Sequence, residues 1–186
     1  MDWKTELDAI IGARHGGRVT GILDRLKGLD ARHPHVAEIH YQLAWTYEGL
    51  ERPTEAAAHY DKAIALGLPP NELSGALIGL SSALRQTGQA GRAVEVLRSA
   101  QSQFPENREI EVFLALALHA AGRHDEALVT ALTTLMETTE DIGISAYQRT
   151  LRHQLSQLEQ VKATDPNDAR ISRTDRKVIG HGSVMD

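Results

Sequence analysis

The chain has 186 residues, of which 41% are hydrophobic and 24% are charged, so it is long enough for one globular domain or one short array of repeats. It contains 24 alanines and 22 leucines but only eight aromatic residues, a composition that favours closely packed helices and argues against an all-β fold. The net charge is −5 and no segment is strongly basic, which predicts that nucleic acid is not a main partner.

Two absences exclude further classes of protein. Cysteine does not occur, so disulfides, thiolate metal ligands and cysteine nucleophiles are all excluded. No apolar run approaches the ~18 residues that a membrane-spanning helix needs, and the first residues lack the apolar stretch of a signal peptide. We therefore expect a cytoplasmic protein that has no contact with a membrane.

The first predicted element is a weak pair of helices over residues 3–36. Apolar residues suit a helix on either side of Gly17, where we expect the turn, and Pro34 closes the unit. The apolar positions of the two helices are Leu7, Ile10 and Ile11, then Ile22, Leu26 and Leu29.

Three stronger units follow at 37–70, 74–107 and 108–141, with a repeat length of 34 residues. In each unit a leading stretch places residues at i, i+3, i+4 and i+7 of one helical face. A trailing stretch repeats small residues that let helix axes approach closely. The equivalent residues are His40, Leu43, Ala44, Tyr47, Ala56, Tyr60 and Ala63, then Leu77, Leu80, Ser81, Leu84, Ala93, Leu97 and Ala100, then Glu111, Leu114, Ala115, Leu118, Ala127, Ala131 and Thr134.

The junctions inside these units carry turn and cap residues. Gly88 and Gly122 predict left-handed turns that end the leading helices, whereas Pro53 predicts the first turn of the trailing helix in the first unit. Asn107 is expected to cap the third unit's first helix. The three inserted residues 71–73 should lengthen the first helix of the second unit.

This period and its pattern of small and large residues resemble the tetratricopeptide repeat (TPR), and the chain looks like the small stand-alone bacterial TPR proteins of uncharacterised role. The resemblance implies an all-α fold, a right-handed superhelical array of antiparallel helix pairs in which 3–36 is a degenerate unit. A helix over about 144–162 is expected to cap the last repeat, so that 1–162 forms one domain followed by a polar tail at 163–186. The apolar stripe predicted for that helix is Ile144, Tyr147, Leu151, Leu155, Leu158 and Val161.

No catalytic or cofactor-binding constellation is evident in the sequence. The run Gly180-His181-Gly182-Ser183 lacks the strand–turn–helix context of a nucleophile site, so we predict no catalytic residues and no cofactor. His33 and His35 are expected in a loop and His40 in a packed position, which predicts no metal site.

The resemblance implies that the first helix of each unit lines a concave groove. The positions turned toward it mix apolar and polar side chains, as recognition surfaces do. For Tyr41 and Trp45 the sequence leaves two alternatives, packing in the core or contact with a ligand. The resemblance also implies that a site for a C-terminal carboxylate, which other members of the family build from lysine, arginine and asparagine, is absent here, because Tyr41, Trp45, Ile78 and Ser82 stand at such positions. The predicted groove positions are Glu38, Tyr41, Trp45, Glu48, Ile78, Ser82, Arg85, Gln86, Glu109, Val112, Leu116 and His119.

Three functions follow as alternatives. The first is a module that binds a peptide or protein partner in the groove. The second is a homodimeric scaffold whose groove or terminal helices pair with a second copy; Val178–Ile179 or Val184–Met185 of the tail are the segments expected to dock in a groove. The third is an enzyme, for which the sequence offers no supporting motif.

Overall fold

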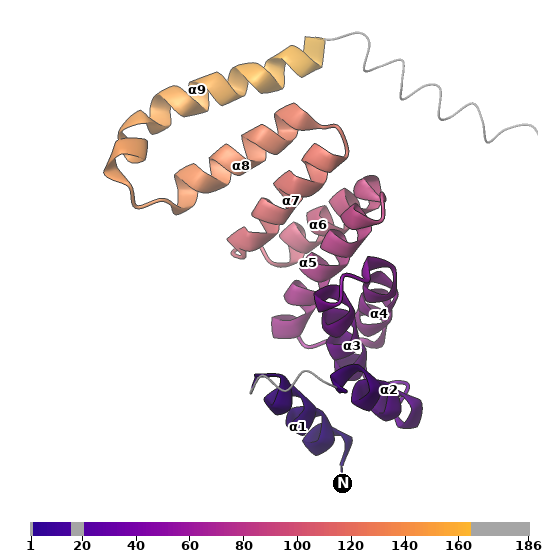
Figure 1. The fold of residues 1–186 in the computed structure, drawn as a ribbon. Helices are drawn as coiled ribbons and strands as arrows, with labels where there is room; N and C mark the ends of the chain where they lie inside the picture. The colour runs from indigo at the N-terminus through magenta and orange to yellow at the C-terminus, as the bar shows by residue number, and fades with distance from the viewer. Residues whose placement is uncertain (1, 16–20, 165–186) are drawn as a thin grey trace, which may run out of the picture. The chain divides into compact units, whose positions relative to one another are not determined.

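The computed structural model describes residues 2–15 and 21–164, with side chains for 2–14 and 21–158. The described residues form helices and no strand, which confirms the all-α prediction (Figure 1). The helices are α1 (Trp3–His15), α2 (Ile22–Arg32), α3 (Ala37–Gly49), α4 (Pro53–Leu66), α5 (Pro70–Gln86), α6 (Ala90–Gln103), α7 (Arg108–Ala120), α8 (His124–Thr138) and α9 (Ile142–Thr164). None of these described helices has the length and apolar character needed to cross a bilayer.

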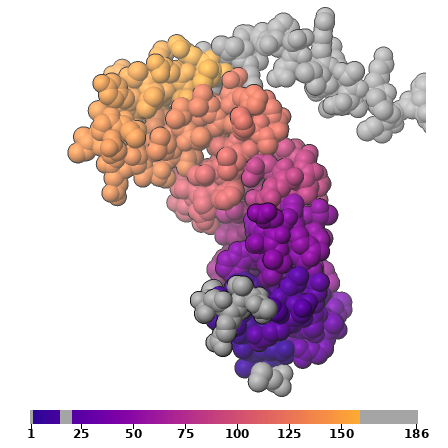
Figure 2. All heavy atoms as spheres, in the orientation of Figure 1, coloured from indigo at the N-terminus to yellow at the C-terminus, as the bar shows by residue number. Residues whose placement is uncertain are grey.

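The chain divides into two compact units, Met1–Thr134 and Leu135–Asp186, and the boundary falls within α8. In the first unit each helix from α1 to α6 packs against the next one, and α5 also contacts both α3 and α7. Figure 2 shows the atoms of α3 to α6 adjoining one another in chain order. This pattern of contacts is the array of helix pairs that the repeats predict, whereas a single domain over 1–162 stays a prediction.

The small residues of the repeat lie where helices meet. Ala44, Ala56, Ala63, Ala93 and Ala100 are fully buried, and the leucines packed around them include Leu43, Leu84, Leu97 and Leu118. Each such leucine contributes about 1.5–3 kcal/mol by leaving water. The prediction is wrong for Ala131, which is exposed. Ala131 replaces the large Tyr60 and Leu97 of the earlier units, and its single methyl group does not fill their place.

The turns inside the repeats follow the predicted chemistry and add one case that the prediction missed. Gly88 and Gly122 have φ of 78° and 75°, and Pro53 stands in the first turn of α4, as expected. In the first unit Glu51 has φ of 56°, the same left-handed backbone that glycine supplies elsewhere. A side chain raises the free energy of this conformation, because its Cβ approaches the backbone carbonyl oxygen.

Two other predictions concern helix ends. Helix α5 has 17 residues against 13 in both α3 and α7, so the insertion lengthens the helix as expected. Asn107 precedes α7 at the cap position, but its side chain makes no capping hydrogen bond. Backbone bonds close this turn instead, since Asn107 N donates to Phe104 O and Ile110 N donates to Asn107 O.

Helix α9 exists, but its apolar stripe differs from the prediction. Tyr147 is 66% exposed, whereas the Gln148 side chain donates from Nε2 to the Met136 carbonyl oxygen. The less exposed positions include Ile144, Gln148, Leu151, Leu155 and Leu158, which are separated by alternating steps of four and three residues. The role of α9 as a cap stays a prediction. Gly17, the Val161 side chain and residues 165–186, which include Gly180–Ser183, lie outside the described residues.

Candidate functional site

The predicted groove positions all lie on α3, α5 and α7, three helices that neighbour one another in the first unit. We call these positions together the inner face. Some of these side chains are packed in the structure and others are exposed, and the extent of packing differs between α3, α5 and α7.

On α3 the inner face is tied to the core by two tyrosines. The Tyr60 hydroxyl donates to Glu48 Oε2 at 2.7 Å, and the rings of Tyr41 and Tyr60 lie 6.1 Å apart. Both side chains rest on glycines of α5: a Cβ at Gly79 would lie 2.3 Å from Tyr60 Cζ, and a Cβ at Gly75 would lie 2.8 Å from the Tyr41 hydroxyl oxygen. Tyr41 is therefore a packing residue between α3 and α5, and Glu48 is already hydrogen-bonded.

Negative charge gathers around Tyr41. Burial, and then the carboxylates of Glu72 and Glu48, raise the pKa of the Tyr41 hydroxyl. Burial and the neighbouring Glu38 raise the pKa of Glu72, although Lys4 opposes this shift. Burial and the Glu48 carboxylate raise the pKa of Tyr60 well above its usual range. Both tyrosines therefore stay protonated at neutral pH, and neither serves as a base.

Trp45 differs from Tyr41, because 46% of its surface is exposed. The guanidinium of Arg14 lies over its ring, 4.9 Å from the centroid. Arg14 also donates to the Gln42 side chain at 2.8 Å and to Thr46 Oγ1, so the end of α1 is tied to α3. Burial lowers the pKa of Arg14, which nevertheless stays charged at neutral pH.

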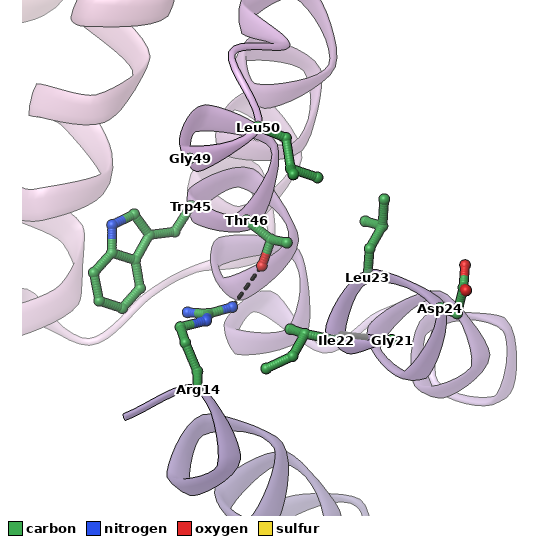
Figure 3. A pocket seen from close by; sticks show the side chains of 9 residues that line it. All are labelled: Arg14, Gly21, Ile22, Leu23, Asp24, Trp45, Thr46, Gly49 and Leu50. Carbon is green, nitrogen blue, oxygen red and sulfur yellow. Dashed lines mark hydrogen bonds between the residues drawn. The ribbon is translucent and has the colours of Figure 1, made fainter. Parts of the chain in front are cut away.

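A pocket of about 580 Å³ lies beside this pair (Figure 3). It is formed by the end of α1, the start of α2 and the last turn of α3. The lining residues are Arg14, Gly21, Ile22, Leu23, Asp24, Trp45, Thr46, Gly49 and Leu50.

The inner-face positions of α5 are partly engaged by their own helix and by the core. Ile78 packs against the core, and the Gln86 side chain lies 3.5 Å from the Ser82 hydroxyl. Arg85 is half-buried, and Gln86 is exposed.

On α7 the same face is open and aliphatic. Val112 and Leu116 are 49% and 47% exposed, although Ile110, Leu114 and Leu118 of that helix are buried. Glu109 is exposed at the start of the helix. His119 turns toward the next helix, since its Nδ1 lies 3.1 Å from His124 Nδ1.

A buried polar cluster lies at the junction of α2, α3 and α4. His40 is fully buried, as predicted, and its Nε2 lies 3.1 Å from the Pro34 carbonyl oxygen and 3.2 Å from Asp30 Oδ1. Both neighbours are acceptors, so Nε2 carries a proton, and His40 Nδ1 lies 3.2 Å from His59 Nδ1. The His59 ring in turn stacks on Tyr47.

These groups do not assemble a metal site among the described residues. No set of three or more histidine, aspartate and glutamate side chains there is arranged to hold a metal ion. The pair His40–His59 is explained by packing, because its outer partners are a carbonyl oxygen, a carboxylate and an aromatic ring.

The structure brings Trp45 together with residues that the sequence analysis did not select, above all Arg14, Thr46 and Leu50. Nothing in the repeat pattern signals Arg14, because it lies in the degenerate unit 3–36, whose first helix does not carry the repeat's pattern of small and large residues. The glycines at 75 and 79 are visible in the sequence at a spacing of four residues, but their tyrosine partners lie on α3 and α4.

Comparison with solved structures gives the same fold. The chain is similar to MamA (21% identity, 72% of each chain covered, TM-score 0.63) and to YrrB, described as a TPR protein with an unusual peptide-binding site (18% identity, 73% of this chain and 68% of that chain, TM-score 0.63). It is also similar to TTC0263, a thermophilic TPR protein of Thermus thermophilus (18% identity, 96% of this chain and 100% of that chain, TM-score 0.57). A search of curated proteins returns no match.

A family model described as the tetratrico peptide repeat matches residues 37–159, which include the three complete repeats. The helix pairs, the buried alanines and the glycine turns of the structure agree with this match. The chain therefore belongs to the tetratricopeptide-repeat family.

Proposed function

We propose that this protein is a non-catalytic interaction module that binds a peptide or protein segment along the inner face. The observation that carries the proposal is the exposure of Val112 and Leu116, which keep 49% and 47% of their surface in contact with solvent on a helix that is otherwise well packed. Neighbouring exposed aliphatic side chains on a face lined by polar groups are typical of a surface that a partner covers.

The family supports the same class of function. TPR arrays typically serve protein–protein interaction, and YrrB is described as having a peptide-binding site. At 18% identity this likeness supports a shared fold, and a shared site is part of the proposal.

Within this proposal the inner-face residues have two roles. Trp45, Val112 and Leu116 are the apolar anchors, because they are the most exposed large apolar side chains of the face. Tyr41 and Glu48 hold α3 against α5 and so keep the anchors in place. Arg85, Gln86 and Glu109 supply polar contacts at the edge of the bound segment.

We propose no catalytic role and no cofactor. The Tyr60 hydroxyl meets the Glu48 carboxylate on this face, and the raised pKa of Tyr60 keeps its proton in place at neutral pH. This hydrogen bond fixes one helix pair, since the tyrosine is buried.

The proposal is tested by capture of partners from a lysate of the source cells. Leu116→Asp places a charge at an exposed anchor, so the captured partner should be lost. The matched control is Leu66→Asp, which changes another exposed leucine on α4, outside the inner face. A partner retained equally by both variants would contradict the proposed site.

Self-association is the second candidate, and one observation favours it. Helix α9 exposes 85% of Ile142 and 66% of Tyr147, two apolar side chains available to a second copy. Light scattering distinguishes the two functions, because a dimer through α9 should dissociate in the variant Ile142→Asp while partner capture persists. The cytoplasmic location, the absence of nucleic-acid partners and the docking of the tail stay predictions.

A further inference from the structure

We propose that the pocket between α1, α2 and α3 receives a large apolar side chain of the partner and the carboxylate of an adjacent aspartate or glutamate. The inference rests on the proposed function, because Trp45 belongs both to the inner face and to this pocket. It adds the chemistry that the partner must carry.

The apolar part of the pocket accounts for the apolar side chain. Ile22 lines the pocket and is buried, while Leu50 and Trp45 stand 52% and 46% exposed at its rim. A volume of about 580 Å³ holds one or two large side chains, and sites of this size bind through apolar walls with a few placed polar groups.

Arg14 accounts for the carboxylate. Arg14 is half-buried, and its guanidinium points toward Trp45 and Thr46 in the pocket (Figure 3). Its hydrogen-bond acceptors on α3 are the Gln42 side chain, the Gln42 carbonyl oxygen and the Thr46 hydroxyl, and all three are uncharged.

No carboxylate among the described residues forms an ion pair with Arg14. Asp24 also lines the pocket, but Figure 3 shows its carboxylate beyond Leu23, away from the guanidinium. The Arg14 guanidinium is a partly desolvated cation with neutral acceptors on one side and apolar walls on the other. An anion next to an apolar group therefore binds this site most favourably, because the anion pairs with the guanidinium and the apolar group packs against the walls.

The exposure of the rim favours a polypeptide over a free small molecule. Small ligands are mostly enclosed by their sites, whereas Trp45 and Leu50 stay about half in solvent. A side chain that projects from a larger partner fills such an open pocket, and the rest of the partner covers the rim.

The test is a selection of random peptides that are displayed without a free C-terminus. The carboxylates that differ between the displayed peptides then all belong to aspartate or glutamate side chains. The full chain is the bait, and the selected peptides are then measured against variants. We expect enrichment of a large apolar residue next to aspartate or glutamate. Arg14→Gln should weaken binding about tenfold or more, because charge-assisted hydrogen bonds to carboxylate are lost.

A second pair of variants does not depend on the contacts that Arg14 makes with α3. Leu50 is exposed at the rim, so Leu50→Glu and Leu50→Lys remove the same apolar side chain and differ only in charge. We expect Leu50→Lys to bind the selected acidic peptides at least severalfold more tightly than Leu50→Glu, with equal thermal stability of the two variants. Affinities that are equal for the two variants would overturn the inference.

The outcomes separate this inference from the proposed function. Peptides that lose binding to Leu116→Asp but bind both Leu50 variants equally overturn the acidic-peptide pocket and leave the inner face as the site. A library that yields no binding peptide contradicts both proposals.

Discussion

The first and third repeats both have a polar residue at the same position of the repeat, but the groups that surround this residue differ. His40 of the first repeat is buried against Pro34, Asp30 and His59. Glu111 of the third repeat accepts from Arg108 at 2.9 Å and from Thr134 at 3.0 Å. The repeat therefore tolerates a polar residue at a packing position when its own helix, a loop or a neighbouring helix supplies its hydrogen-bond partners.

The inner faces of the two repeats also differ in how far their side chains are packed. Tyr41 of the first repeat packs beside Tyr60, which donates to Glu48, whereas its equivalent Val112 in the third repeat is exposed. Trp45 and its equivalent Leu116 are exposed in both repeats. The position of Tyr41 and Val112 thus serves packing in one repeat and remains available for binding in the other. Substitutions at Tyr41, Glu48 and Tyr60 should therefore change stability, whereas those at Val112 and Leu116 should change binding.

The largest expected effect is at the contact between α5 and Tyr60. Gly79→Ala gains helix propensity, but its Cβ would lie 2.3 Å from the buried ring, so we expect a net loss of about 1–3 kcal/mol of unfolding free energy. Gly75→Ala should cost less, because the hydroxyl end of the half-buried Tyr41 can shift. Gly28→Ala, in open space on α2, should stabilise by about 0.5–1 kcal/mol. Urea denaturation measures all three, and equal effects at 79 and 28 would contradict the close contact.

Next in size is the hydrogen bond that fastens the first repeat. Tyr60→Phe removes the hydroxyl that donates to Glu48, and we expect a loss of about 1–2 kcal/mol. Leu116→Asp, on the exposed face of α7, should change the unfolding free energy by less than about 0.5 kcal/mol. A larger loss of unfolding free energy for Leu116→Asp than for Tyr60→Phe would contradict the claim that Leu116 contributes less to stability than the hydrogen bond of the first repeat.

The turns of the two repeats predict a smaller, stabilising effect. Glu51 has φ of 56°, where the third repeat has Gly122 with φ of 75°. Glu51→Gly should therefore stabilise the protein by about 1 kcal/mol, measured by thermal unfolding. Glu51→Ala is the control, since it removes the same charge but keeps a Cβ and should bring no such gain.

The histidine cluster makes the first repeat sensitive to acid. Burial, then the nearby His40, lower the pKa of His59, with smaller opposing and supporting effects from Asp30, Lys62 and Lys27. The unfolded chain, with a histidine pKa near ~6.5, then binds more protons than the native state as the pH falls. We expect the unfolding free energy to decrease from pH 7 downward through this range, and His59→Gln to flatten the dependence. An unchanged slope in His59→Gln would show that other groups cause it.

Much of the fold follows from the sequence because the repeat imposes small residues at fixed positions, such as Ala44 and Ala56, and turn residues between helices. The pocket at Arg14 does not follow, because the first helix lacks the repeat's phase and its contacts come from the end of α3. Tyr147 and Gln148 show a second limit. Adjacent residues lie only about 100° apart around a helix. The apolar pattern therefore predicts a stripe that includes the aromatic Tyr147, although the neighbouring Gln148 is the residue that faces inward.

The central claim is that a partner covers the open part of the inner face. A photo-crosslinking amino acid placed at Leu116 tests it most directly, with the same group at Leu66 as the control, because both leucines are exposed and only Leu116 lies on the inner face. We predict that irradiation in source cells joins a discrete protein to position 116 and not to position 66. Crosslinking at both positions alike, or at position 66 alone, would contradict the claim.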